Sequence, residues 1–361
     1  MPEETRAVRE SETLDWASLT TYLHAHLPPH AWRTATPTRI EQFGGGHSNL
    51  TYLLAFGELE LVLRRPPLGP VPARAHDMAR EFRWLSALHP LFPLAPRPWL
   101  LCEDLAVIGS VFYVMERRHG LVIRHDEPPG IDGQPEVRHR IGLSLVDTLA
   151  DLHRVDASLP ALAALGKPAG FVTRQVRGWT ERWQAARTDD ITNAATIEAV
   201  AAWLATHLPP EPARPTVVHG DFKLDNVMLA TTPPHAVVAV LDWEMCALGD
   251  PLVDLGIFLG YWLPTPGSER GGRRDALSTV TNRAGYPDRQ AVLDRYARRT
   301  AADLSHLGFY EAFAVFKLAV VLQQIYVRYV RGQTDDARFA GLGARVDRLA
   351  VRAAAVVDRQ S

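Results

Sequence analysis

The sequence VVHGDFKLDN at residues 217–226 decides how the rest of the chain is interpreted. A short β-prone run ends there, Asp221 follows it, and the amide side chain of Asn226 comes five positions later. The sequence LDWE at residues 241–244 puts a second carboxylate, Asp242, at the end of another β-prone run. Asp and Asn are common turn formers at strand ends, so each residue alone has a structural explanation. The three together, in this order, instead indicate one chemical site.

Phosphoryl transfer is the chemistry that uses this set of residues. A carboxylate must accept the proton of the attacking hydroxyl, and oxygen ligands must hold Mg²⁺, a hard cation. We therefore predict that Asp221 is the catalytic base and that Asn226 and Asp242 face the metal ion. Lys223 lies two residues after Asp221, where its ammonium group would offset the charge that develops on the transferred group. The alternative for Lys223 is an ordinary solvated lysine.

A glycine cluster precedes two β-prone runs near the N-terminus. The sequence FGGGHSN at residues 43–49 leads into runs at 50–56 and 59–63, which we predict to pair as a hairpin around Gly57. Glycines let the backbone approach phosphate oxygens and point N–H groups at them. The predicted nucleotide contacts in this stretch are Gly45, Gly46, Ser48 and Asn49. The alternative is a flexible turn without a ligand.

A cation and a carboxylate follow the hairpin. Arg64 directly follows the second run, and Glu81 lies in a stretch whose apolar residues recur every three or four positions from Met78 to Leu88, which predicts a helix. Kinases fix the α- and β-phosphates of ATP with a strand cation that pairs with a helix carboxylate. We predict this role for Arg64 and Glu81, with a surface charge pair as the alternative.

Composition limits the classes of function. The formal net charge of −2 over 361 residues gives no electrostatic footprint for nucleic acid or an anionic membrane, so neither partner is expected. The two cysteines, Cys102 and Cys246, make a disulfide framework improbable and favour a reducing cytoplasm. The N-terminus lacks the pattern of a secretory signal, and no stretch approaches 18 uncharged apolar residues, so we expect no leader and no membrane span.

The chain changes character after its first third. We expect a short helix over 14–30, strands up to 115, and mainly helices beyond, including a long one over 311–330. We therefore predict an N-terminal lobe over residues 1–118, which carries the phosphate-binding loop, and a helical C-terminal lobe over 119–361. The Gly-, Pro- and Arg-rich segment 264–285 is predicted to be a mobile insertion.

These motifs resemble the aminoglycoside phosphotransferase family. The resemblance rests on HGD at 219–221 with Asn226, LDWE at 241–244, and GDP at 249–251 with Asp254. A closer similarity is to the kinase-like domain fused to some acyl-CoA dehydrogenases. The stretches that carry this similarity are GGHSNLTY at 45–52, VLRRPP at 62–67, RQVR at 174–177 with Trp179, and DWEM at 242–245.

The resemblance implies an α+β, protein-kinase-like fold with ATP between a small β-rich lobe and a larger helical lobe. It implies that Glu116 and Arg118 belong to a hinge that binds adenine through its backbone, and that Asp254 braces the Asp221 loop. The chain departs from the wider family at Arg64, where a lysine is usual, and at His47. Arginine binds phosphate as a planar fork rather than as a point charge.

The acceptor is not fixed by the family. Residues 256–345 contain 13 Lys or Arg and 8 Asp or Glu, whereas a pocket for a polycationic aminoglycoside should be acidic. We therefore expect a small hydroxylated acceptor that is anionic or neutral, such as a hydroxyacyl-CoA. The alternatives are a macrolide or aminoglycoside phosphotransferase and a catalytically silent nucleotide-binding module. A protein kinase is disfavoured, because only 11 residues separate Asp242 from Asp254 and leave no room for a long activation loop.

Overall fold

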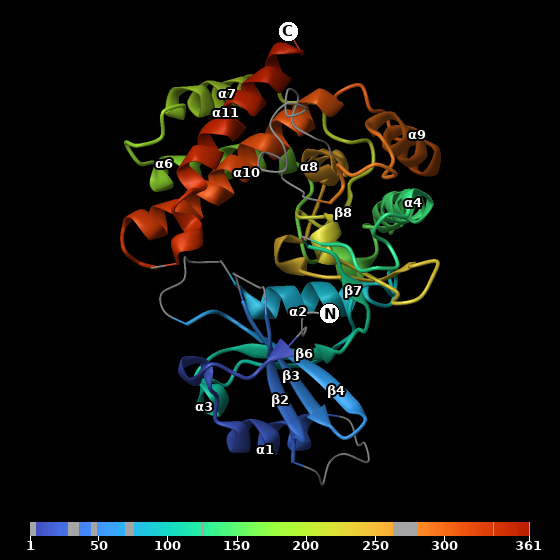
Figure 1. Ribbon diagram of the computed structural model, residues 1–361, viewed down its shortest axis with the longest axis vertical. Helices are drawn as coiled ribbons and strands as arrows, with labels where there is room; N and C mark the ends of the chain where they lie inside the picture. Colours follow the sequence, from blue (N-terminus) through green and yellow to red (C-terminus); the bar gives the residue numbers. More distant parts are fainter. Residues whose placement is uncertain are drawn as a thin grey trace. The chain divides into compact units, whose positions relative to one another are not determined.

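The computed structural model describes residues 5–27, 36–44, 49–68, 76–124, 126–262, 280–334 and 336–360. The internal contacts divide the chain into two compact units, both drawn in Figure 1. Unit 1 comprises residues 1–121, 228–231 and 238–246, and unit 2 comprises 122–227, 232–237 and 247–361. The first boundary therefore falls at Leu121, close to the lobe boundary that the sequence predicts at 118. Asp221 and Asn226 belong to unit 2 and Asp242 to unit 1.

Unit 1 is built on a six-stranded antiparallel sheet. Its order is β1-β2-β3-β4-β6-β5. The strands are β1 (Thr5–Arg6), β2 (Arg39–Phe43), β3 (Leu50–Phe56), β4 (Leu59–Arg65), β5 (Pro98–Cys102) and β6 (Phe112–Glu116). β3 and β4 form the predicted hairpin, in which Phe56 pairs with Leu59 and Gly57 takes a left-handed φ of 65°.

The pleat of β4 sorts its side chains between two faces. Leu61 and Leu63 lie in an apolar cluster with Leu19 and Leu23 of α1 (Trp16–His26). Successive residues of a strand point to opposite faces, so Arg64 points to the other side, where α2 (Met78–Leu88) packs near β5 and β6. The apolar spacing of α2 buries Trp84 and leaves Glu81 on the same inner face. A cation on β4 and a carboxylate on α2 are thereby brought together.

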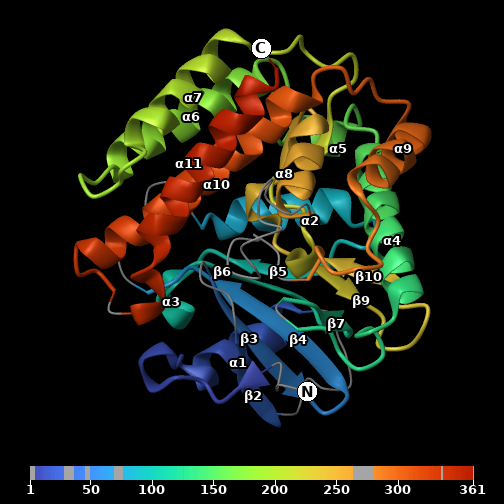
Figure 2. The same ribbon diagram turned by 45° about the horizontal axis from the view of Figure 1, so that its top comes forward.

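Unit 2 is mainly helical, and α10 lies at its centre. Its helices of four or more residues are α4 (Pro135–His153), α5 (Pro160–Ala163), α6 (Phe171–Ala186), α7 (Ala194–Thr206), α8 (Leu252–Trp262), α9 (Arg289–Thr300), α10 (Leu307–Val330) and α11 (Leu342–Asp358), within the residues that the structure describes. α10 packs against α6, α7, α8 and α11, and Figure 2 shows α10 and α11 side by side. α10 is long and apolar enough by composition to cross a membrane, but its most apolar window is 56% buried in the core of unit 2.

Short strands complete the fold and lead into the loops of interest. β8 (Thr216–Val218) pairs antiparallel with β11 (Ala247–Gly249) in unit 2. A three-stranded sheet has the order β10-β9-β7. Its strands are β7 (Leu121–Val122), β9 (Val227–Leu229) and β10 (Val237–Val240). Among the described residues, the shorter helices are α3 (Leu105–Ile108) and the 3-10 turns η1 (Glu10–Glu12), η3 (Leu224–Asn226), η4 (Trp243–Met245) and η7 (Ala337–Phe339).

The predicted mobile insertion over 264–285 is wrong at its C-terminal end. Residues 263–279 lie outside the described part of the chain. Arg283, however, forms a 2.6 Å hydrogen bond to the buried carboxylate of Glu127, which also accepts from Arg138 of α4. Gly285 lies so close to Pro135 that a Cβ atom there would come within 2.4 Å of its Cα. These distant contacts fix residues 280–285, which a local excess of Gly and Arg could not reveal.

Candidate active site

Residues 219–226, here called the Asp221 loop, follow β8 in unit 2 and end in η3. Gly220 has a left-handed φ of 85°, a conformation that glycine adopts without strain. The buried carboxylate of Asp254, on α8, accepts hydrogen bonds from the amide N–H groups of His219 at 2.6 Å and of Gly220 at 2.7 Å. One side chain of a helix therefore fixes two adjacent peptide units of the loop, as the resemblance implied for Asp254.

The environment of Asp254 favours its ionised form. Burial by itself would raise the pKa of Asp254, but the hydrogen bond and charge of His153 and the amide of His219 together hold that pKa below its usual value. The Nε2 of His153 lies 3.2 Å from Asp254, and its Nδ1 lies 2.6 Å from the hydroxyl of Tyr296. Asp254 thus accepts from three donors, and all three are groups of the protein itself.

Three predicted site residues meet inside the Asp221 loop. Lys223 Nζ donates to the Asp221 carboxylate at 2.8 Å, and Asn226 Nδ2 donates to the same carboxylate oxygen at 2.9 Å. Asn226 Nδ2 also donates to the backbone carbonyl of Asp221 at 2.9 Å. The Asp221 side chain keeps 23% of its surface exposed, so a substrate hydroxyl can still reach it. This carboxylate is oriented by two donors and accessible, as a general base must be.

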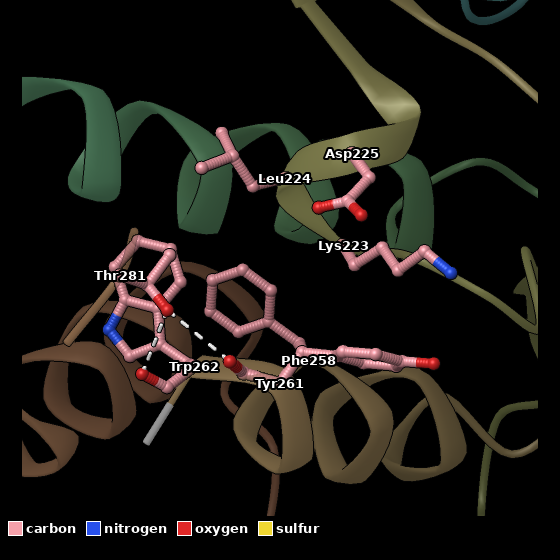
Figure 3. A pocket seen from close by; sticks show the side chains of 7 residues that line it. All are labelled: Lys223, Leu224, Asp225, Phe258, Tyr261, Trp262 and Thr281. Atoms are coloured by element: carbon pink, nitrogen blue, oxygen red, sulfur yellow. Dashed lines mark hydrogen bonds between the residues drawn. The ribbon is translucent and has the colours of Figure 1, made fainter. Parts of the chain in front are cut away.

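A small pocket in unit 2 is lined in part by residues of the Asp221 loop (Figure 3). It is lined by Lys223, Leu224, Asp225, Phe258, Tyr261, Trp262 and Thr281. The ammonium of Lys223 lies 4.8 Å from the centre of the Tyr261 ring. Burial opposes the charge of Lys223, but Tyr261 and Asp221 outweigh it and raise the pKa of this lysine. The pocket therefore combines a permanent cation, one carboxylate and aromatic walls.

Unit 1 contains the predicted pair of Arg64 and Glu81. Arg64 Nε lies 3.3 Å from the Glu81 carboxylate, and Arg64 Nη2 lies 2.5 Å from Asp242 and 3.7 Å from Glu244. One guanidinium group thus faces three carboxylates. Burial raises the pKa of Glu81, and the charge of Arg64 opposes that rise. Burial and the charge of Asp242 likewise raise the pKa of Glu244 to about 7.

The turn at Asp242 has an uncommon backbone. Asp242 has a φ of 67°, in the left-handed region that residues other than glycine seldom occupy. Trp243 follows it, buries its ring against Phe92 and donates from Nε1 to the carbonyl of Val240 at 2.8 Å. Residues held in such sparsely populated conformations cluster at ligand and catalytic sites. The packing of Trp243 maintains a conformation that presents the Asp242 carboxylate to Arg64.

Neighbouring residues hold the same turn in ways that the motifs did not predict. Asn49, expected to bind the nucleotide, donates from Nδ2 to Glu244 at 2.9 Å, and its Oδ1 accepts from Nδ1 of His76 at 2.8 Å. Arg80 of α2 donates to the carbonyls of Glu244, at 2.8 Å, and of Cys246. The signal that could have found Arg80 is weak, because its partners lie more than 160 positions away along the chain.

The predicted hinge residues, Glu116 and Arg118, form polar contacts with each other and with nearby residues of unit 1. The Glu116 carboxylate accepts from the Arg97 amide at 2.7 Å, and the Glu116 amide donates to the Arg97 carbonyl at 2.9 Å. Arg118 bonds to Glu116 at 2.6 Å and to the Pro93 carbonyl at 2.7 Å. Because these bonds use the Glu116 amide, an adenine contact by this residue would have to go through its carbonyl group. Gly45, Gly46 and Ser48 lie outside the described residues.

Each unit contains one predicted oxygen donor of the kind that Mg²⁺ binds, Asn226 in unit 2 and Asp242 in unit 1. Within the described ranges, no group of three or more His, Cys, Asp or Glu residues forms a metal cage. Mg²⁺ does not require one, because it is usually held by one or two carboxylates together with substrate phosphates. Asn226 donates both of its hydrogen bonds from the amide nitrogen, so its amide oxygen is not used in them. That oxygen and the Asp242 carboxylate have the chemistry that a magnesium ion needs.

Comparison with known proteins gives consistent matches. Residues 39–299 match the phosphotransferase enzyme family. Acyl-CoA dehydrogenase family member 11 of Rattus norvegicus is 36% identical over 339 residues, which cover 92% of this chain and 42% of that protein. The chain spans less than half the length of the curated relatives it matches.

Solved structures share the fold. A Ralstonia eutropha protein provisionally assigned as an aminoglycoside phosphotransferase has a TM-score of 0.79 and 30% identity, covering 96% of this chain and 99% of its own. An aminoglycoside phosphotransferase with GDP and kanamycin has a TM-score of 0.60 and 15% identity, covering 93% and 98%. A spectinomycin phosphotransferase with ADP and spectinomycin has a TM-score of 0.59 and 11% identity, covering 95% and 98%. The predicted α+β, protein-kinase-like fold is confirmed.

Proposed function

The chain belongs to the phosphotransferase enzyme family, and on that premise we propose that it transfers the terminal phosphoryl group of ATP, with Mg²⁺, to a hydroxyl group of a small molecule. The observation that carries the proposal is the geometry of the Asp221 loop. Its carboxylate is partly exposed, is oriented by Lys223 and Asn226, and lies on a loop that Asp254 fixes from α8. A loop that only closes a turn would not need a buried anion to hold its peptide groups.

Each residue would have one task in the reaction. Asp221 accepts the proton of the acceptor hydroxyl as that oxygen attacks the γ-phosphorus, and the bond from this phosphorus to the bridging oxygen of ADP breaks. Lys223 offsets the negative charge on the transferred group. Arg64, fixed by Glu81, contacts the α- and β-phosphates. Asn226 and Asp242 would hold Mg²⁺ together with the phosphates, and the ion would neutralise part of the phosphate charge.

We propose an acceptor that is anionic or neutral, with a hydroxyacyl-CoA as the leading candidate. The excess of basic residues over 256–345 supports this choice, since a polycationic acceptor requires several carboxylates. The pocket beside Asp221 contains one carboxylate, Asp225, and one cation, Lys223. The relative named acyl-CoA dehydrogenase family member 11 also favours an acyl-CoA acceptor. The neighbours that hold kanamycin and spectinomycin make aminocyclitol antibiotics the alternative to be tested.

A labelled-phosphate assay tests the proposal. The protein is incubated with γ-labelled ATP and Mg²⁺ and with hydroxyacyl-CoA esters, kanamycin, spectinomycin or a macrolide. We expect transfer to the thioester, and a loss of about 10²- to 10⁴-fold in kcat for Asp221→Asn. Asp189→Asn makes the same change at an exposed position of unit 2 and should leave kcat unaltered. Transfer to an antibiotic alone would overturn the acceptor, and ATP binding without transfer to any acceptor would indicate a silent nucleotide-binding module.

A further inference from the structure

Lys317 is a buried charge in the middle of the apolar helix α10. Its exposed fraction is 8%, and the residues on either side of it, Phe316 and Leu318, are buried as well. Its ammonium group donates a hydrogen bond to the carbonyl of Gly220 and lies 5.3 Å from the centre of the Trp179 ring. An unpaired buried ammonium is costly, so a helix core that only needed packing would use Leu or Met here.

Lysine is rare in this chain, which makes the position of Lys317 more informative. Lys167, Lys223 and Lys317 are the lysines in the whole sequence, whereas Lys and Arg together number 39. Two of these lysines contact the Asp221 loop, Lys223 through Asp221 and Lys317 through Gly220. The motifs did not single out Lys317, because it lies 97 positions beyond its partner in an otherwise apolar run.

The contact of Lys317 completes the support of the two peptide groups on either side of the Gly220 Cα atom. The amide N–H of Gly220 is held by Asp254 of α8 at 2.7 Å, while the carbonyl of Gly220 is held by Lys317 of α10. This glycine immediately precedes Asp221, and its φ of 85° gives the chain a sharp turn there. Two buried side chains of opposite charge, from two different helices, therefore fix the backbone that aims the Asp221 carboxylate.

We propose that Lys317 is a positioning residue for phosphoryl transfer, which holds the Gly220 carbonyl and thereby fixes the backbone that carries Asp221. The inference rests on the proposed function of Asp221. The charged groups that act on the ammonium are Asp221 and Lys223 of the loop, Asp254 of α8 and Arg182 of α6. Burial lowers the pKa of Lys317 to about 8, and the charges of Asp221 and Asp254 oppose this change.

Turnover of γ-labelled ATP, with water or the best acceptor of the panel, gives the first test. We expect Lys317→Met to lower kcat by about 100-fold with little change in the KM for ATP, because the substitution displaces the base and leaves the nucleotide contacts intact. Gln323→Met is the matched control, since Gln323 is another buried polar residue of α10 whose partners are Ala186 and Thr188. A kcat for Lys317→Met within about twofold of the wild type, with normal folding, would overturn the proposal.

The pH profile separates a positioning charge from a packing role. The wild-type kcat should fall as pH rises through about 8, where Lys317 loses its proton. Lys317→Arg keeps a charge at every pH studied, so its residual activity should show no such alkaline decline. An identical alkaline decline in both proteins would contradict the proposal, because another group would then be titrating.

A third test follows the titration of Lys317 itself by NMR. It requires neither an acceptor nor a folded Lys317→Met protein. Selective ¹³Cε labelling of lysine gives signals from Lys167, Lys223 and Lys317 alone, and the signal missing in Lys317→Arg identifies the third. We expect Asp221→Asn to shift the titration midpoint of the Lys317 signal to lower pH, and Asp189→Asn to leave that midpoint unchanged. An unmoved midpoint in Asp221→Asn would overturn the inferred link. Absence of turnover with a moved midpoint would instead count against the proposed function alone.

Discussion

Replacing Asp254 with Asn should both destabilise unit 2 and slow phosphoryl transfer. The carboxylate is fully buried and accepts from the amides of His219 and Gly220 and from the ring of His153. In Asp254→Asn, one acceptor oxygen remains, and an N–H donor faces a second donor. A buried donor left without a partner costs about 1–3 kcal/mol, and loss of the charge-assisted bond costs about 1.5–3 kcal/mol. We expect the free energy of unfolding to fall by about 3–5 kcal/mol.

The measurement is urea unfolding of Asp254→Asn and of wild type at pH 7, with Asp189→Asn as the exposed isosteric control. The dependence on pH has a definite sign. The pKa of Asp254 is lower in the folded protein, so its contribution to stability is present above its unfolded pKa of about 3.9 and is lost as pH falls through the folded value. The difference in the free energy of unfolding between wild type and Asp254→Asn should therefore shrink below about pH 4. A difference under about 0.5 kcal/mol at pH 7 would refute the bracing role of Asp254.

Two further substitutions test the charge clusters of the separate units, again by urea unfolding. Arg64→Met leaves the buried carboxylate of Glu81 without its cation and should lower the free energy of unfolding by about 3–5 kcal/mol. Arg64→Lys should lower it less, because lysine retains the charge and loses only the planar fork. Equal losses in the two variants would contradict the role of this charge. Glu127→Gln removes the anion shared by Arg138 and Arg283 and should lower the free energy of unfolding by about 2–4 kcal/mol. Asp126→Asn is the control, because the adjacent Asp126 side chain is 95% exposed. A Glu127→Gln protein as stable as Asp126→Asn would show that this cluster does not hold residues 280–285.

The sequence predicted those features whose cause is local. The hairpin of β3 and β4 follows from two β-prone runs around Gly57, and α2 follows from its apolar spacing. The short spacing of Asp221, Lys223 and Asn226 already predicted that the three belong to one site, but it did not predict that Lys223 and Asn226 both donate to the Asp221 carboxylate. Each of these features depends on periodicity or turn chemistry within a short window.

What the sequence could not provide are contacts made by tertiary packing. Lys317 reaches Gly220 across 97 positions, Arg80 reaches Glu244 across 164, and Arg283 reaches Glu127 across 156. Nothing in the residues around Lys317 or Arg80 marks them as polar partners of a distant loop. For the same reason, the Gly-, Pro- and Arg-rich composition of residues 264–285 predicts a mobile insertion, although the buried carboxylate of Glu127 fixes its C-terminal end. The bracing role of Asp254 was expected only through the family resemblance.

We propose that Asp221, Asn226 and Asp242 act around one magnesium ion at the terminal phosphate of ATP. A crystal structure with Mg²⁺ and a non-hydrolysable ATP analogue tests it most directly. We predict a metal ion bound by the amide oxygen of Asn226, a carboxylate oxygen of Asp242 and phosphate oxygens, with the Asp221 carboxylate facing the γ-phosphate on the acceptor side. A metal ion bound by neither Asn226 nor Asp242, or an Asp221 carboxylate turned away from the γ-phosphate, would contradict the claim.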